Sequence, residues 1–354
     1  MGSVYGRCFK VSTFGESHGL AVGVIVDGVP PGLELDNQVI QYELDKRKPG
    51  TGKFVSQRRE PDTVEILSGV DGNGKTLGSP ICMVVRNTDS RSKDYESIAD
   101  MFRPGHADYT YFRKYGVAPQ PGGGRSSGRE TVARVAAGAL AKIILAKIGV
   151  SLAAYTVRIG SVRAQKVEIG FAMDNPLRCA DPDKAEQMQA EIAKAISDGD
   201  SIGGIVEVIA DGVQPGLGDP VFDKLDAMLA AAMLSIGGVK GIEFGEGFHA
   251  AQLRGSENND QMRSEGFLSN HAGGILGGIS TGQPIVMRLA VKPTASISIE
   301  QQTLDTAGKA CRISVKGRHD PCLCPRIAPV AESMAAMTLA DAWLFNRAFQ
   351  GIFS

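Results

Sequence analysis

Three of the five histidines stand in short segments where glycine or proline adjoins a charged residue. His18 lies in Gly-Glu-Ser-His-Gly, His106 in Arg-Pro-Gly-His-Ala-Asp and His319 in Arg-His-Asp-Pro-Cys. An imidazole changes charge near neutral pH, so a histidine that small neighbours leave open to a ligand is suited to proton transfer. We predict acid–base chemistry at these positions. The alternative is that each is a loop histidine with a structural hydrogen bond.

Basic residues gather in two segments that glycine interrupts. Arg47 and Lys53 stand on either side of Pro-Gly-Thr-Gly, while Arg125 and Arg129 flank the pair Ser126 and Ser127. Guanidinium groups, hydroxyls and backbone N–H groups bind phosphate or carboxylate, and the second segment leads into a predicted helix N-terminus, which favours an anion. We expect both segments to bind an anionic ligand. A solvated surface is the alternative.

A third candidate anion site follows the glycine-rich loop 270–280. There an apolar run, 285–291, leads to Lys292, Thr294 and Ser296. The lysine and the hydroxyls are suited to a second phosphate. The one candidate metal site, Cys322-Leu-Cys324 beside His319, lacks a distant second pair of ligands, so we predict no metal.

Residues 69–76 match the G-x-x-x-x-G-K-[ST] pattern of a phosphate-binding loop. That mechanism needs a helix directly after the pattern, but Leu-Gly-Ser-Pro and a second apolar run follow. Asp71-Gly72 and Asn73-Gly74 are typical of hairpin turns. We therefore predict a turn, with nucleoside-triphosphate binding as the alternative.

Composition limits the class of protein. Of the 354 residues, 44 are glycine and 43% are hydrophobic, with no Gly-X-Y repeat, so the chain is globular rather than collagenous or disordered. Lys and Arg total 38 against 39 Asp and Glu, which argues against a general binder of nucleic acid or membrane surfaces. Because no long apolar run or signal peptide is evident, we expect a cytoplasmic protein with reduced cysteines.

The elements that position these groups can be predicted from capping signals and periodicity. Asp181-Pro182 opens a helix that ends at Asp198-Gly199. Further helices are expected at 36–46, 130–148, 221–236 and 329–350, and strands at 20–26, 64–67, 81–85, 205–209 and 285–291. Because strands and helices do not alternate one for one, we predict an α+β fold with antiparallel sheets on buried helices. No linker divides residues 1–354, which indicates a single large domain.

Five stretches resemble signature segments of the chorismate synthase family and occur in the family's order. They are residues 15–19 (GESHG), 103–111 (RPGHADYTY), 124–131 (GRSSGRET), 269–280 (SNHAGGILGGIS) and 317–322 (GRHDPC). The resemblance implies a carbon–oxygen lyase at the last step of the shikimate pathway. 5-Enolpyruvylshikimate 3-phosphate would lose phosphate and a ring proton by anti 1,4-elimination, giving chorismate, with reduced FMN required but no net redox change. It also implies a β-α-β sandwich, with long helices between antiparallel sheets, and a homotetramer.

The resemblance also implies residue roles. His18 would keep a proton near the reduced flavin, His106 would protonate or stabilise the departing phosphate, and Asp320 would assist proton removal at the flavin N5 side. Substrate or NADP binding falls to Arg47, Lys53 and Arg129. The FMN-contacting positions would be Arg125, Ser126, Ser127, Gly237, Gly238, Gly277, Lys292, Pro293, Thr294, Ala295, Ser296 and Arg318.

Two departures from the family pattern are visible. The family often has Asn-Ala at Gly237-Gly238, which puts side-chain contacts to FMN there in doubt, and arginine at Lys53, which weakens a bidentate role.

Other readings stay open. A flavoprotein with net hydride transfer and a non-catalytic binder of anions or nucleic acid are the alternatives. The flavin would be reduced by NAD(P)H on this chain or by an external flavin reductase, and no segment is left over for a reductase domain.

Overall fold

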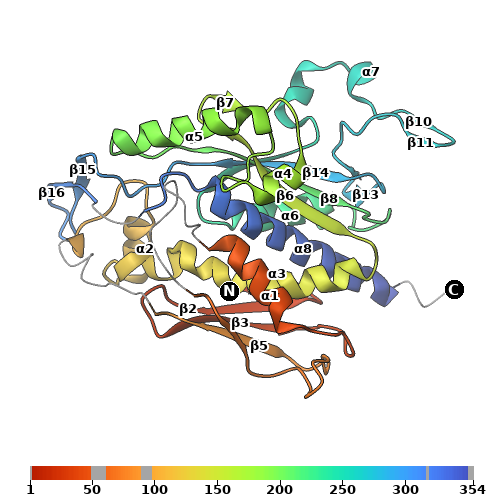
Figure 1. Cartoon of the computed structure of the whole chain (residues 1–354), viewed down its shortest axis with the longest axis horizontal. Helices are drawn as coiled ribbons and strands as arrows, with labels where there is room; N and C mark the ends of the chain where they lie inside the picture. Colours follow the sequence, from red (N-terminus) through yellow and green to blue (C-terminus); the bar gives the residue numbers. More distant parts are fainter. Residues whose placement is uncertain (1, 49–60, 89–97, 316–318, 350–354) are drawn as a thin grey trace.

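Two five-stranded antiparallel sheets form the framework of the protein (Figure 1). The computed structural model describes residues 2–48, 61–88, 98–315 and 319–349. The first sheet comes from the N-terminal quarter of the chain. Its strands, in spatial order, are β1 (Val4–Tyr5), β2 (Lys10–Gly15), β3 (Ala21–Asp27), β5 (Ile81–Arg86) and β4 (Val64–Ile66).

The second sheet is assembled from distant parts of the chain. Its strands, in spatial order, are β7 (Val162–Arg163), β6 (Ser151–Ile159), β8 (Gly204–Asp211), β14 (Ile285–Val291) and β9 (Val239–Phe244). In β14 the buried Ile285, Met287 and Leu289 alternate with partly exposed neighbours, as the period of a strand requires. One face of this sheet therefore joins the core.

Three short hairpins lie outside the sheets: β10–β11 (Met262–Arg263, Gly266–Phe267), β12–β13 (Ile275–Leu276, Ile279–Ser280) and β15–β16 (Gln301–Leu304, Ala310–Ile313). The α-helices among the described residues are α1 (Asn37–Arg47), α2 (Asp108–Tyr115), α3 (Thr131–Ala146), α4 (Ile169–Asp174), α5 (Pro182–Ser197), α6 (Leu225–Leu234), α7 (Gly255–Asn258) and α8 (Cys324–Phe349). The 3₁₀ segments η2 (Pro121–Ser126), η3 (Gly128–Glu130) and η4 (Gly247–Gln252) accompany them.

Helices α3 and α8 pack against each other at the centre of the molecule. Figure 1 shows them between the sheet that holds β2, β3 and β5 and the strands β6 and β8, and α3 contacts the former while α8 contacts the latter. Their close approach depends on Gly138, because a β-carbon there would lie 2.3 Å from Ser333 Cβ of α8. The predicted antiparallel sheets on buried helices are confirmed.

Most predicted elements agree with the structure to within a few residues, but two helix starts were wrong. Helix α6 begins at Leu225 rather than at the predicted 221, because Val221 has a left-handed φ of 72° and Phe222 is exposed. Helix α8 begins at Cys324, before the predicted start, and Pro329 lies inside it. A proline removes one backbone donor, which the packing of this buried helix tolerates.

The segment that matches a phosphate-binding loop is a turn between β4 and β5. Asp71 Oδ1 accepts hydrogen bonds from the backbone N–H groups of Asn73 and Lys75, both at 2.9 Å. Thr76 then pairs with Val70, and no helix begins before β5. The prediction of a turn is confirmed.

Candidate active site

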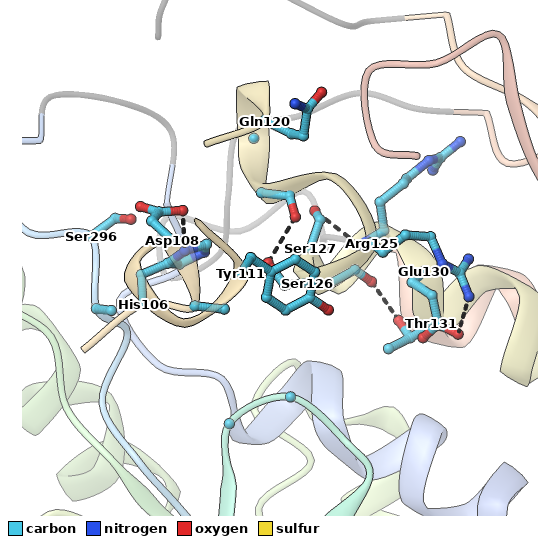
Figure 2. A pocket seen from close by; sticks show the side chains of 18 of the residues that line it. His106, Asp108, Tyr111, Gln120, Arg125, Ser126, Ser127, Glu130, Thr131 and Ser296 are labelled. Carbon is cyan, nitrogen blue, oxygen red and sulfur yellow. Dashed lines mark hydrogen bonds and ion pairs between the residues drawn. The ribbon is translucent and has the colours of Figure 1, made fainter. Parts of the chain in front are cut away.

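A cleft of about 1040 Å³ gathers most of the predicted site residues from distant parts of the chain (Figure 2). It is lined by residues 2–3, the loop after β2, Arg47 at the end of α1, the segment from Arg103 into α2 and beyond it, the loop through η2 and η3 into α3, the end of α6, the loop after β14, and the segment from His319 into α8. The cavity therefore forms where loops meet the ends of helices.

His18 and His106 lie against two adjacent glycines in η2. A β-carbon on Gly122 would be 2.2 Å from His18 Cε1, and one on Gly123 would be 2.9 Å from His106 Cε1. Both glycines have positive φ, 63° and 88°, a region that residues with a side chain rarely adopt. The glycine triplet therefore brings two histidines that are 88 positions apart in the chain to one turn of backbone.

His106 forms a buried network with Asp108 and Arg103. Its Nδ1 lies 2.8 Å from Asp108 Oδ1, and Arg103 donates to both carboxylate oxygens, from Nε at 2.7 Å and from Nη2 at 2.9 Å. Burial opposes ionisation of Asp108, but the hydrogen bonds from Arg103 and His106 outweigh it and hold the pKa of this carboxyl well below its usual range. The imidazole thus stands beside a fixed negative charge.

The loop after β14 links two other parts of the cleft. Thr294 Oγ1 donates to the main-chain carbonyl of Asp320 at 2.6 Å, and Lys292 Nζ donates to the carbonyl of Gly105. Arg326 Nη1 in turn donates to Asp320 Oδ2 at 2.7 Å. The loop thereby connects the segment that carries the predicted carboxylate Asp320 with the segment that carries His106.

A buried carboxylate joins two of the basic residues. Arg47 Nη2 donates to Asp62 Oδ2 at 2.6 Å, and Arg129 Nη1 donates to Asp62 Oδ1. Burial raises the pKa of Asp62, but the two guanidinium groups lower it by more. Burial also lowers the pKa of Arg47 to about 10, with Arg326 adding to the effect. Arg47 Nε is buried and has no hydrogen-bond partner among the described residues.

The groups of the Arg125 segment bond within the protein. Arg125 donates to the carbonyls of Thr13 and Gly15, at 3.2 and 3.1 Å, and so braces the end of β2. Ser126 Oγ donates to Gly123 O at 2.7 Å, and Ser127 Oγ accepts from the N–H of Arg129. A ligand here would meet backbone groups or replace these bonds.

The lining of the cleft carries excess positive charge. Its described residues include six arginines and Lys292 against four carboxylates. Three of the carboxylates, Asp108, Glu130 and Asp320, are each bound by an arginine. Cations that cluster around a partly closed space attract anions strongly, so the site suits a small molecule with several negative charges.

Fourteen of the predicted site residues line the cleft: His18, Arg47, His106, Arg125, Ser126, Ser127, Arg129, Gly237, Gly238, Lys292, Thr294, Ala295, Ser296 and Asp320. Pro293 lies against Gly203 instead. Gly277 lies in the β12–β13 turn. Its neighbour Gly278 accepts a hydrogen bond from Leu225 N at the start of α6, whereas Gly237 follows the end of that helix. Lys53 and Arg318 lie outside the described residues.

Several lining or supporting groups were missed by the sequence reasoning. Asp62 sits in a segment with no motif, and the roles of Gly122 and Gly123 depend on histidines far away in the chain. Asp108, by contrast, follows His106 by two positions, and that spacing could have suggested a pair. Arg326 carries no such signal.

Two further observations concern metals and membranes. Among the described residues, no three or more His, Cys, Asp or Glu side chains gather as a metal site. Cys322 and Cys324 are buried free thiols. None of the helices in the described part of the chain is long and apolar enough to span a membrane.

The fold and the cleft together define a protein with a partly closed, basic site for an anionic small molecule, which His18 and His106 line. The family described as chorismate synthase matches residues 9–344, and the chain belongs to this family. A solved structure described as "Crystal Structure of Chorismate Synthase" is 33% identical, covers 97% of this chain and 93% of its own, and superposes with a TM-score of 0.75. The family consists of carbon–oxygen lyases that act at the last step of the shikimate pathway.

Proposed function

We propose that the chain catalyses the FMN-dependent anti 1,4-elimination of phosphate from 5-enolpyruvylshikimate 3-phosphate, giving chorismate. The observation that carries the proposal is the convergence of His18, His106 and Asp320 on one basic cleft. The substrate has two carboxylates and a phosphate, and FMN has a phosphate, so the lining must compensate several negative charges that leave water. Clustered arginines and backbone donors do this.

The residues present fit a reduced flavin mononucleotide. The buried Arg47 Nε that lacks a partner offers a donor at the cleft, and Gly122 and Gly123 leave room for the rings of His18 and His106 beside it. Arg125, Ser126, Ser127 and the loop 292–296 would hold the flavin and its phosphate. When bound, reduced FMN would supply electron density to the allylic system of the substrate and take it back. The FMN contact of Gly277 stays a prediction.

The protein side chains have three tasks in this reaction. His106 donates a proton to the departing phosphate, while Arg47 and Arg129, held by Asp62, bind anionic groups of the substrate. His18 keeps a proton on the flavin side of the cleft, where Ser17 Oγ lies 3.1 Å from its Nδ1. Asp320 assists removal of the ring proton. Such fixed charges stabilise a transition state because they need no reorganisation during the reaction.

Anaerobic release of phosphate from 5-enolpyruvylshikimate 3-phosphate, with and without reduced FMN, tests the proposal. We expect turnover only with reduced FMN, without net oxidation of the flavin. His106→Ala should lower kcat by roughly 10²-fold or more, as the loss of a general acid does. Full turnover without flavin would refute the proposal, and stoichiometric oxidation of FMN would favour net hydride transfer instead.

The wider setting belongs to the same proposal. Residues 1–354 would form one β-α-β sandwich domain, which the packing of α3 and α8 between strands of the two sheets supports. We further propose a cytoplasmic homotetramer that receives reduced FMN from an external flavin reductase. Sedimentation would give the oligomeric state. Turnover with oxidised FMN and NADPH, without added reductase, would contradict the dependence on an outside reductase.

A further inference from the structure

Given the acid role proposed above for His106, we infer that Asp108 is a positioning residue for this histidine. Braced by Arg103, Asp108 holds the imidazole as the tautomer that is protonated on Nδ1. The other ring nitrogen, Nε2, then faces the cleft and is the atom that exchanges a proton with the ligand.

The first step is the contact between the ring and the carboxylate. Asp108 Oδ1 lies 2.8 Å from His106 Nδ1, and Asp108 is only 4% exposed. An ionised carboxylate accepts hydrogen bonds and donates none, so the hydrogen of this contact must come from Nδ1. The low pKa of Asp108 agrees with an ionised group.

Arg103 supplies the second step. Its Nη2 lies 3.0 Å from His106 Nδ1 and 2.9 Å from Asp108 Oδ1, so it could in principle donate to either. Donation to the ring would need a bare Nδ1, whose lone pair would then face Oδ1 at 2.8 Å. Donation to Oδ1 avoids that repulsion, because Oδ1 accepts from both Nδ1 and Nη2. Arg103 also fixes Oδ2 through Nε at 2.7 Å, so the carboxylate cannot turn away.

Gly123 limits the opposite edge of the ring. A β-carbon at Gly123 would lie 2.9 Å from Cε1 and 3.2 Å from Nε2 of His106, so this edge of the ring packs beside a glycine where a larger residue would displace it. The histidine side chain is 18% exposed while that of Asp108 is 3% exposed. The imidazole is thus held at Nδ1 in the protein interior, and because His106 lines the cleft, we place Nε2 on the side of the ligand.

This arrangement has a direct chemical consequence. The protonated ring gives its Nε2 hydrogen to an oxygen of the departing phosphate and becomes the neutral Nδ1–H tautomer, so no second proton has to move. The partner of the other ring nitrogen sets the tautomer in such pairs, and loss of the partner lowers activity strongly while the fold survives.

The direct test is ¹⁵N NMR of the full-length protein labelled with [¹⁵N]histidine, recorded over a pH range that includes the neutral imidazole. The His106→Asn spectrum identifies the signals of His106. We expect the neutral form to carry its hydrogen on Nδ1. A neutral form protonated on Nε2 in the wild-type protein would overturn the inference, whatever the variants do.

Asp108→Asn gives the second arm, because an amide can donate to Nδ1 and so favour the opposite tautomer. We expect kcat to fall by about 10²-fold or more with a much smaller change in KM, a shift of the His106 signals towards the Nε2–H form, and partial rescue in Asp108→Glu. Asp71→Asn, in the β4–β5 turn, is the matched control and should change neither kcat nor the His106 signals. Wild-type kcat and unchanged His106 signals in Asp108→Asn would overturn the inference.

The two proposals fail in different ways. An active His106→Ala would refute the acid role, and the spectrum of the wild-type protein would still decide the tautomer. If Asp108→Asn does not fold, Arg103→Lys keeps the charge but loses the paired hydrogen bonds to Asp108. Arg103→Lys should lower kcat and weaken the preference of His106 for the Nδ1–H tautomer. A wild-type kcat with an unchanged spectrum would contradict the bracing role of Arg103.

Discussion

The α-carbon of Gly123 faces the imidazole of His106 so closely that a β-carbon on it would lie 2.9 Å from Cε1. A glycine at this point leaves room for the ring, and its φ of 88° lets the chain turn there. The position of the histidine therefore depends on a residue that has no side chain.

Gly123→Ala should lower kcat for phosphate release by roughly 10²-fold, because a misplaced catalytic group loses about that much. Gly116→Ala is the matched control. Gly116 has a similar φ of 69°, but a β-carbon there would meet nothing within 4 Å. Both variants carry the backbone strain, so both should melt at a lower temperature than the wild type. Equal kcat values in the two variants would show that the contact with His106 is unimportant.

Asp62→Asn should raise KM for the substrate and destabilise the fold. Arg47 and Arg129 would lose a buried partner, and breaking such a buried pair typically costs about 3–5 kcal/mol. Urea unfolding and steady-state kinetics measure the two effects. As a control, Glu65→Gln breaks only the exposed ion pair with Arg86 and should change stability by less than about 1 kcal/mol.

The same carboxylate predicts a dependence of stability on pH. The pKa of Asp62 is lower in the folded protein than in the unfolded chain, where it is about 3.9. The stability that it contributes is therefore fully present above that pH and is lost as the pH falls towards the folded pKa. The loss of unfolding free energy between pH 5 and about pH 3 should be smaller in Asp62→Asn. Parallel curves would contradict this prediction.

Gly138→Ala should lower the free energy of unfolding by about 1–3 kcal/mol, the usual cost of overpacking. The new methyl group would lie 2.3 Å from Ser333 Cβ and push α3 from α8. Gly170→Ala is the control, since Gly170 lies in helix α4 and its β-carbon would meet nothing within 4 Å. That substitution should be neutral or stabilising. Equal unfolding free energies of the two variants in chemical denaturation would contradict the prediction, because they would show that α3 and α8 can move apart at no cost.

Lys75→Ala should leave kcat and KM within about twofold of the wild type. Lys75 is exposed in the β4–β5 turn and does not line the cleft. A surface substitution of this kind has a small effect. Loss of phosphate release in this variant would instead revive the nucleotide-binding reading of residues 69–76.

The sequence by itself determined those features that depend on near neighbours. Asp181 caps α5 and Gly199 follows its end, as the capping pattern predicted, and the apolar run 285–291 forms strand β14. The turn at Asp71 and the histidine segments were also visible, because turn and motif residues lie next to one another in the chain.

Only the tertiary structure decided which side chains meet. Asp62 joins Arg47, 15 positions before it, to Arg129, 67 positions after it. Gly122 meets His18 across 104 positions, and Gly123 meets His106 across 17. Such pairings follow from how the loops between sheets and helices close on one another, and no local pattern records that. The start of α6 was predicted wrongly for the same reason. At Val221 the backbone has a left-handed conformation, although the local sequence predicted a helix from this residue.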